Sequence, residues 1–472
     1  MQHGHDCKVL VQAVCRVTKI PEGKCPVLRG DDVGATVMTQ SKYTGIKFAR
    51  LVGLVLLGST AANLCYNAIM AALGYGWPYN FMLFDPIDRF ADFFKLAFSY
   101  GSTDIHATFV TGQQAEQLAV YMHKSQHNLG TIVNPDHMLP VATAMAIIVR
   151  KLMGLVDPFI VFSVCTAVAL LSLVATFQSY VTNDKERMYW LLGAIASYPL
   201  MFAIDRGHLI ALVCAIALIA GARHLFDARR LTWPAAAALS FAVCIRPNLL
   251  SIPVLLITLL SPTKIRDLVI FFATCLLLFI LSMTISHALF PHYSFETWLM
   301  GLADYHRRYV ALPINLGYVS SLTSVFMIHS GYNPLVERAC FALGALIGIL
   351  AMHACFKNKM PSSHAAFIAI GLTFIATPAL NDYHLLPFFI PLLFLSREGG
   401  PENHVDWIIV FSSLFALSPK NYFFGNDNSA DAWSWQVICN PIVISIATIW
   451  VLMHHLRTPR TDRSIVGTAI SQ

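Results

Sequence analysis

Charged residues are scarce in this sequence of 472 residues. Asp, Glu, Lys and Arg make up 12% of the chain and hydrophobic residues 56%, whereas about a quarter of a soluble domain is charged. The hydrophobic runs recur along nearly the whole chain, which a single buried core does not produce. A soluble enzyme, a disordered hub and a nucleic-acid-binding protein are therefore excluded, and the sequence indicates a polytopic membrane protein.

Several familiar signatures are also missing. The 11 cysteines lie mainly inside apolar runs, where a small hydrophobic residue is the ordinary interpretation, so no disulfide framework is evident. The histidines and cysteines of the first 25 residues have no zinc-binding spacing, and no glycine-rich phosphate loop is present. We therefore expect no metal site and no cofactor, and nothing indicates a divalent cation.

Basic residues predict the orientation in the membrane. Residues 1–48 are polar and contain no signal-peptide core, and eight Lys and Arg, from Lys8 to Arg50, precede the first apolar run. Since positive charge favours the cytoplasmic side, we expect 1–48 to be a cytoplasmic tail, with Met38 as an alternative start of translation. Later basic clusters near 185–187, 223–230, 264–266, 357–359, 397 and 457–463 are assigned to the same side.

The apolar runs then give an all-α bundle of about 12 spans with both ends inside. Residues 75–138 and 290–316 lie outside in this arrangement. It requires that the run 233–261 break at Arg246-Pro247 into two short helices, and that 139–156 be an interfacial or re-entrant helix. The runs lie near 51–74, 139–156, 158–181, 188–204, 208–225, 233–261, 267–289, 337–356, 363–380, 384–396, 405–419 and 435–455.

Polar side chains from six segments gather at the predicted outer face. Each charge near the hydrocarbon costs on the order of 2.5–3.5 kcal/mol on insertion scales, so such groups are usually paired, cavity-facing or functional. They are Asp85, Asp88 and Asp92; Asp136 and His137; Asp205, Arg206 and His208; Arg246; His306, Arg307 and Arg308; and Asp382, Tyr383 and His384.

Some of these residues have a plain structural interpretation. Arg307 and Arg308 fit solvated loop residues, Arg206 and Asp205 fit a pair that caps two helices, and His384 fits a hydrogen-bonded residue at a helix start. Arg246 is different because it interrupts an apolar run with no acid nearby in sequence. A buried cation needs an anion, and a phosphate would serve.

The stretch FMLFDPIDRFADFFKLAFSYG in the first outer loop combines acids with aromatic residues. On a helix Asp88 and Asp92 share a face, and the phenylalanines around them supply apolar surface for lying on a membrane. We therefore expect amphipathic helices in this loop. A carboxylate placed there can meet a lipid-borne substrate and act as a general base.

Together these features resemble the GT-C superfamily of membrane glycosyltransferases. Within it the chain is most similar to the GT87 (DUF2029) group, which includes polyprenyl-phosphomannose-dependent α-mannosyltransferases. The resemblance rests on DRFADFFKLAFSYG, on NPDHMLP (without the usual tyrosine and one proline), on DRGHLIALVCAIALIAGARHLFDARRLTWPAAAALSFAVCIRPNLL and on ALNDYHLLPFFIPLLFL. His208 stands where Gln or Asn is usual. The likeness implies a catalytic body over 49–400, followed by C-terminal helices and a tail over 401–472.

The resemblance also implies a reaction. A sugar, mannose or similar, moves with inversion from a polyprenyl-phosphate donor to a lipid or glycan acceptor, at the outer face of a plasma membrane, here a bacterial inner membrane. A loop acid is the base: Asp92 first, then Asp88, then Asp85. Arg246 with Arg206 and Arg307 or Arg308 would hold the donor phosphate. The other expected substrate contacts are His137, His208, His306, Asp382, Tyr383 and His384. Membrane lipids are the remaining partners expected.

Two other functions fit a polytopic chain. A transporter or flippase of a lipid-linked or small anionic substrate predicts internal repeats and broken helices in corresponding halves, and no repeat is evident. An O-antigen-type polymerase or ligase usually carries its large outer loop late in the chain, whereas here the long loop comes early. Both alternatives stay open at this point.

Overall fold

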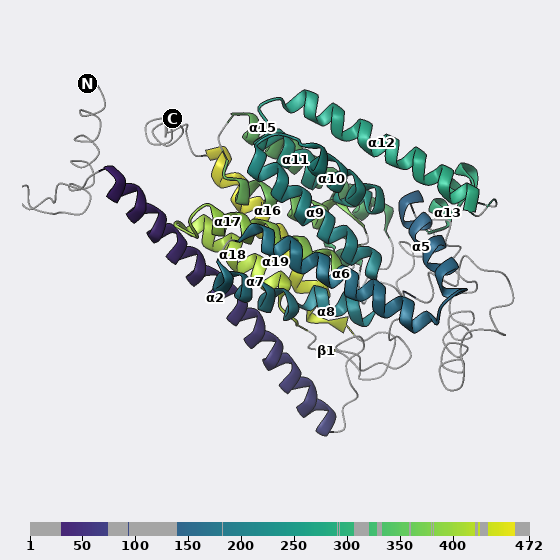
Figure 1. Ribbon diagram of the computed structural model, residues 1–472, viewed down its shortest axis with the longest axis horizontal. Helices are drawn as coiled ribbons and strands as arrows, with labels where there is room; N and C mark the ends of the chain where they lie inside the picture. Colours follow the sequence, from purple (N-terminus) through teal and green to yellow (C-terminus); the bar gives the residue numbers. More distant parts are fainter. Residues whose placement is uncertain are drawn as a thin grey trace, which may run out of the picture.

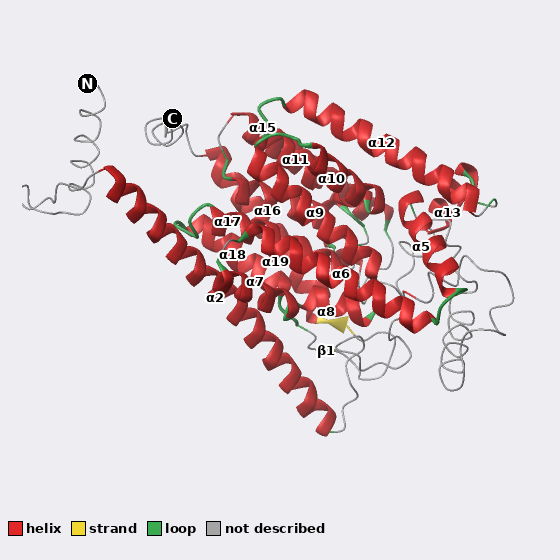
Figure 2. Cartoon of the chain, viewed as in Figure 1, coloured by secondary structure: helices red, strands yellow, loops and turns green. Residues whose placement is uncertain are grey.

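The protein is almost entirely helical in the computed structural model (Figures 1 and 2). The structure describes residues 30–73, 93, 139–181, 183–289, 291, 293–305, 321–327, 333–357, 360–378, 380, 382–420, 423–424 and 433–457. The strands β1 (Phe423–Phe424) and β2 (Trp433–Ser434) form one short antiparallel pair. The predicted all-α class is therefore confirmed.

The helices follow one another with short connections in most of the described chain. In order they are α2 (Gly30–Ala72), α5 (Pro140–Met153), α6 (Pro158–Tyr180), α7 (Asp184–Ile195), α8 (Tyr198–Asp205), α9 (Leu209–Ala228), α10 (Trp233–Ile245), η2 (Pro247–Leu249), α11 (Ser251–Leu260), α12 (Lys264–Leu289), α13 (Phe295–Tyr305), α14 (Leu322–Met327), α15 (Pro334–Lys357), α16 (Ser362–Ala376), η5 (Asp382–Phe388), α17 (Phe389–Arg397), α18 (His404–Leu417) and α19 (Trp435–Arg457).

Six helices in the described chain are long and apolar enough to cross a membrane, and α7 with α8, bent by 53°, makes a seventh if the pair is one span. The six lie in α2, α6, α9, α12, α15 and α19. Four more apolar helices, α10, α16, α18 and the η2–α11 segment, are shorter than a full span. The expected count of about 12 is not confirmed by these helices and stays a prediction.

The predicted break at Arg246-Pro247 is confirmed. Helix α10 ends at Ile245, and α11 begins only after the single turn of η2. The Asp267 carboxylate accepts hydrogen bonds from the Leu231 amide, just before α10, and from the Ser261 hydroxyl, just after α11, at 2.9 and 2.7 Å. The start of α10 and the end of α11 therefore lie together, and Arg246 lies at the opposite end of both helices.

Helix α5 is short and ends on two charges, as expected of an interfacial element. Its 14 residues span about 21 Å, and Arg150 and Lys151 lie in its last turn, whereas the similarly short α10 carries no charged residue. It lies across the end of the bundle where α12 finishes (Figure 1). The Ser286 hydroxyl of α12 donates to the Pro140 carbonyl at 3.2 Å, which attaches the start of α5 to that end.

Helix α2 lies along one edge of the bundle and packs closely on α7 (Figure 1). A Cβ at Gly53 would come within 2.6 Å of the Tyr189 carbonyl oxygen, so glycine permits this approach. The Phe48 and Trp190 rings meet edge to face at 6.1 Å between centroids. Of residues 75–138, which are predicted to lie outside, the structure describes only Phe93, which is buried with its ring 4.9 Å from that of Phe162 in α6. The amphipathic helices expected elsewhere in that loop lie outside the described residues.

Candidate functional site

The turn between α8 and α9 is shaped by Gly207. Its φ of 70° lies in the left-handed region, where glycine has no Cβ penalty. The Gly207 amide donates to the Ile204 carbonyl at 3.0 Å, and the His208 amide donates to the Ala203 carbonyl at 2.7 Å. This pair of bonds is the Schellman motif that closes a helix C-terminus. It ends α8 and places His208 at the N-cap of α9.

His208 joins the start of α9 to the end of α10. Its Nδ1 accepts from the Ala211 amide at 3.3 Å, and its Nε2 lies 2.9 Å from Nη2 of Arg246. A guanidinium has only donors, and a neutral imidazole accepts at one nitrogen only. The imidazole therefore cannot satisfy Ala211 and Arg246 together, and one of the two donors needs another acceptor.

Arg246 follows α10 in an extended conformation, with φ −138° and ψ 90°. Its side chain forms no ion pair with a carboxylate in the described part of the chain, and its buried Nε has no hydrogen-bond partner. Arg246 is thus a half-buried cation with no carboxylate partner among the described residues, and the anion expected for it stays a prediction.

The segment η5 brings three further predicted residues to this end of the bundle. The Tyr198 hydroxyl at the start of α8 donates to Oδ2 of Asp382 at 3.1 Å. The Tyr383 ring lies 4.2 Å from the His208 ring and 4.6 Å from the His384 ring, between centroids. We call Tyr198, His208, Arg246, Asp382 and Tyr383 the Arg246 site, with His384 beside it.

Lys420 is a buried cation that the sequence analysis missed. It follows α18, and its Nζ donates to the carbonyls of Phe415 and, at 2.7 Å, Ser418. Burial lowers the pKa of Lys420 to about 7, and the negative charge of Asp382 opposes that shift. The available signal was a single lysine directly after the apolar run 405–419, at the end predicted to be outside.

Seven predicted site residues lie outside the described residues. They are Asp85, Asp88, Asp92, His137, His306, Arg307 and Arg308. Arg206 is described and half-buried beside Gly207. The structure therefore brings together His208, Arg246, Asp382, Tyr383 and His384, and the placement of the loop acids and of the arginine pair stays a prediction.

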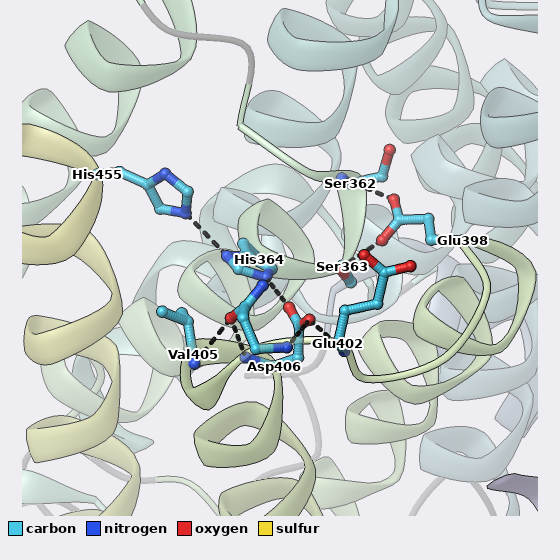
Figure 3. A network of polar contacts seen from close by, with 9 residues as sticks. Ser362, Ser363, His364, Glu398, Glu402, Val405, Asp406 and His455 are labelled. Atoms are coloured by element: carbon cyan, nitrogen blue, oxygen red, sulfur yellow. Dashed lines mark hydrogen bonds and ion pairs between the residues drawn. The ribbon is translucent and has the colours of Figure 1, made fainter. Parts of the chain in front are cut away.

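A second polar cluster, which was not predicted from the sequence, lies at the starts of α16 and α18 (Figure 3). His364 Nε2 lies 2.6 Å from Oδ1 of Asp406, and His364 Nδ1 lies 2.8 Å from Nε2 of His455. Oδ2 of Asp406 accepts from the amides of Glu402 and Asn403 at 2.8 and 3.1 Å.

Glu398 completes this second cluster. Its carboxylate accepts from the Ser362 amide at 2.9 Å and from the Ser363 hydroxyl at 2.6 Å. We call Ser362, Ser363, His364, Glu398, Asp406 and His455 the Asp406 cluster. Among the described residues no group of three His, Cys, Asp or Glu side chains could hold a metal ion, so this histidine-rich cluster is a hydrogen-bonded network.

Comparison with known families identifies the chain. A model of glycosyltransferase family 87 matches residues 140–378, just over half of the sequence. The match begins at the start of α5, contains His208 and Arg246, and ends between α16 and η5. No curated protein and no solved structure matches the chain. The family and the six apolar helices together make this a multi-pass membrane protein. The chain belongs to glycosyltransferase family 87, the membrane glycosyltransferase group that its sequence resembles.

Proposed function

We propose that the chain moves a sugar, mannose or similar, from a polyprenyl-phosphate donor to a lipid or glycan acceptor, with inversion at the anomeric carbon. The site of transfer is the Arg246 end of the bundle, at the outer face of a bacterial inner membrane. One observation carries the proposal: Arg246 is a half-buried cation with an unpartnered Nε and no carboxylate partner in the described chain.

The surroundings of Arg246 favour an anionic ligand. Because His208 cannot accept from both Arg246 and Ala211, an incoming oxyanion would take the Arg246 donors and leave His208 as the cap of α9. A guanidinium presents two parallel N–H groups that match phosphate oxygens. The phosphate of a lipid-linked sugar supplies such oxygens, and its negative charge would balance the positive charge of Arg246.

Chemistry at a sugar phosphate explains why cations are needed. When the bond from the anomeric carbon to the phosphate oxygen breaks, the leaving phosphate carries about two negative charges. Cations placed beforehand then stabilise the transition state more than the ground state. Arg246 fills this role in the proposal, with Arg206 and Arg307 or Arg308 beside it. His137, His306, Asp382, Tyr383 and His384 would orient the substrates.

The base in this proposal is an acid of the first outer loop. Asp92 is the first choice, ahead of Asp88 and Asp85, because the next residue, Phe93, is buried against Phe162 of α6. That contact attaches the chain beside Asp92 to the helical body. The carboxylate would take the proton of the acceptor hydroxyl as its oxygen attacks the anomeric carbon on the face opposite the phosphate.

The proposed membrane arrangement keeps about 12 passes. That number results if α7–α8 and η5–α17 each count as one pass and every shorter apolar helix crosses. The basic clusters at 223–230 and 264–266 then lie in the cytoplasm, which leaves Arg246 at the outer end. The start of α10 beside the end of α11, both bonded to Asp267, supports this out-and-back path.

The proposal is tested with purified protein in lipid nanodiscs, a radiolabelled polyprenyl-phosphate sugar and a membrane lipid extract. Arg246→Ala should fold and lose roughly 10²–10³ in turnover, the size of an oxyanion-type contact. Arg246→Lys should recover only part of this turnover, because the lysine ammonium keeps the charge but lacks the two parallel N–H groups of the guanidinium. Wild-type turnover in Arg246→Ala, or no transfer by the wild type from any such donor, would refute the proposal.

A further inference from the structure

Helix α2, which precedes the region matched by the family model, carries a buried stripe that changes character along its length. Residues at helical spacing of three and four turn inward, as one face of a packed helix does. In the first half these residues are apolar, and in the second half they are polar. The stripe runs through Ala49, Val52, Leu56, Thr60, Asn63 and Asn67, all buried, whereas Ala61, Ala62, Cys65 and Ala68 are exposed.

The polar half of the stripe lies beside the Arg246 site. The Thr60 hydroxyl donates to the Ala196 carbonyl at 2.6 Å, at the bend between α7 and α8. Leu64, next to Asn63, packs against the buried group formed by Tyr198, Phe202, Ala203, Ala211 and Tyr383. Tyr198 and Tyr383 are themselves members of the Arg246 site. Asn63 is the neighbour of Leu64 in sequence, and Asn67 follows one helical turn later on the same buried stripe.

The two asparagines satisfy each other only in part. Nδ2 of Asn67 donates to Oδ1 of Asn63 at 3.2 Å. Nδ2 of Asn63 and Oδ1 of Asn67 are buried and have no hydrogen-bond partner, and both side chains are 0% exposed. A buried amide group without a partner is costly, and inside a membrane water does not relieve that cost.

The unused pair of atoms defines the ligand chemistry. The pair has one N–H donor and one oxygen acceptor without partners. If the O and N atoms of both amides are exchanged, one donor and one acceptor are again left without partners. A hydroxyl group fits it, since it donates to one amide oxygen and accepts from one amide N–H. A phosphate does not fit, because its oxygens only accept and would face the Asn67 oxygen.

We propose that Asn63 and Asn67 bind a carbohydrate hydroxyl, on the transferred sugar or on the acceptor, and thereby set substrate specificity. This inference rests on the proposed function. In this proposal Arg246 binds the donor phosphate, and the asparagine pair of α2 hydrogen-bonds a neutral hydroxyl group. The first helix thus contributes to the site, although the family model does not cover it.

The inference is tested with sugar analogues that each lack one hydroxyl. Wild type should discriminate against one deoxy donor, or one deoxy acceptor, by roughly 10- to 100-fold in kcat/KM. The double variant Asn63→Leu with Asn67→Leu should use the complete and the deoxy substrate equally. The deoxy series that loses its discrimination shows whether the hydroxyl belongs to the donor or the acceptor.

Two controls separate recognition from a structural role. Thr60→Val removes a hydroxyl that already has a partner in the chain, so it should keep the wild-type discrimination. The double variant should melt no lower than wild type, because it removes both amides and their unpartnered atoms from an apolar interior. The single variants Asn63→Leu and Asn67→Leu provide the same discrimination readout if the double variant folds poorly.

The outcomes distinguish the two proposals. If the asparagine variants transfer sugar and still reject the deoxy substrate as wild type does, the asparagine pair is structural and the proposed function stands. If wild type discriminates against no deoxy donor and no deoxy acceptor, the inference is also wrong. If wild type transfers no sugar from any polyprenyl-phosphate donor, the proposed function is wrong, and the proposed hydroxyl site is wrong as well.

Discussion

At the Asp406 cluster, the carboxylates of Asp406 and Glu398 accept from side chains and amides of the same chain. At the Arg246 site and in the polar stripe of α2, Nε of Arg246, Nδ2 of Asn63 and Oδ1 of Asn67 have no hydrogen-bond partner. Both regions bury polar groups, and only one of them satisfies those groups internally. Closed networks hold helices together, whereas open ones are suited to a ligand.

The same comparison applies to the helix termini. The start of α18 has a complete capping box, in which Asn403 and Asp406 bond each other's backbone amides. The start of α9 is capped by His208, whose imidazole is also within hydrogen-bond distance of Arg246. One helix end is closed by residues with no competing contact, and the other shares its cap with a cation. We expect substitutions in the first region to change stability and those in the second to change turnover.

The largest effect should come from the loop acids. Asp92→Asn should lose about 10²–10⁴-fold in turnover, the usual contribution of a general base, while still binding the lipid donor. Asp88→Asn and Asp85→Asn should lose less, and the relevant measurement is single-turnover transfer from a labelled donor.

The matched control for the loop acids is Asp406→Asn, which neutralises an acid of the closed network. Its turnover per folded molecule should equal that of wild type. If all three loop variants are fully active, the base does not lie in this loop. If Asp88→Asn shows the large loss instead, the base lies four residues earlier in the sequence than we propose.

The next largest effect should be on stability. Asp406→Ala removes the acceptor of His364 and of two amides at the start of α18. Losing a helix cap costs about 1 kcal/mol, and an orphaned buried donor costs about 1–3 kcal/mol. We therefore expect about 3 kcal/mol less free energy of unfolding in detergent titrations, with unchanged turnover in the fraction that stays folded.

Asp184→Ala is the control for this stability change. Asp184 also lies at a helix start, and its carboxylate pairs with Arg187 at 3.0 Å, but its side chain is 91% exposed. Exposed ion pairs contribute about 0–1 kcal/mol. Equal losses in Asp184→Ala and Asp406→Ala would mean that the closed network contributes no more than a surface pair.

Composition and charge were sufficient for the helical class, the break at Arg246 and the short helix α5. These features depend on local rules, such as the effect of proline on its predecessor and the length needed to span a bilayer. Arg246 could also be singled out from the sequence, because an arginine inside an apolar run is costly wherever the chain folds; its role in binding phosphate stays a prediction.

Contacts between distant segments were not predictable in the same way. His364, Asp406 and His455 come from three helices, and each residue alone reads as an ordinary polar group near a helix end. Asn63 and Asn67 lie in an apolar run and carry no charge, so nothing in the sequence separates them from inert polar residues. Only packing shows that the first set is satisfied and the second is not.

The smallest expected effect concerns Lys420, a buried residue whose charge interacts with that of Asp382 in the Arg246 site. Its pKa of about 7 lies below the ordinary 10.5 of a lysine. Between these values the unfolded chain binds more protons than the folded one, so stability should rise as the pH increases from about 7. Lys420→Met removes this contribution and should flatten the rise of the melting temperature between about pH 7 and pH 9. Lys185→Met removes the same charge from an exposed position at the start of α7 and should keep the wild-type slope. An unchanged slope in Lys420→Met would mean that the ammonium stays charged in the folded protein, held by the Phe415 and Ser418 carbonyls and by the charge of Asp382.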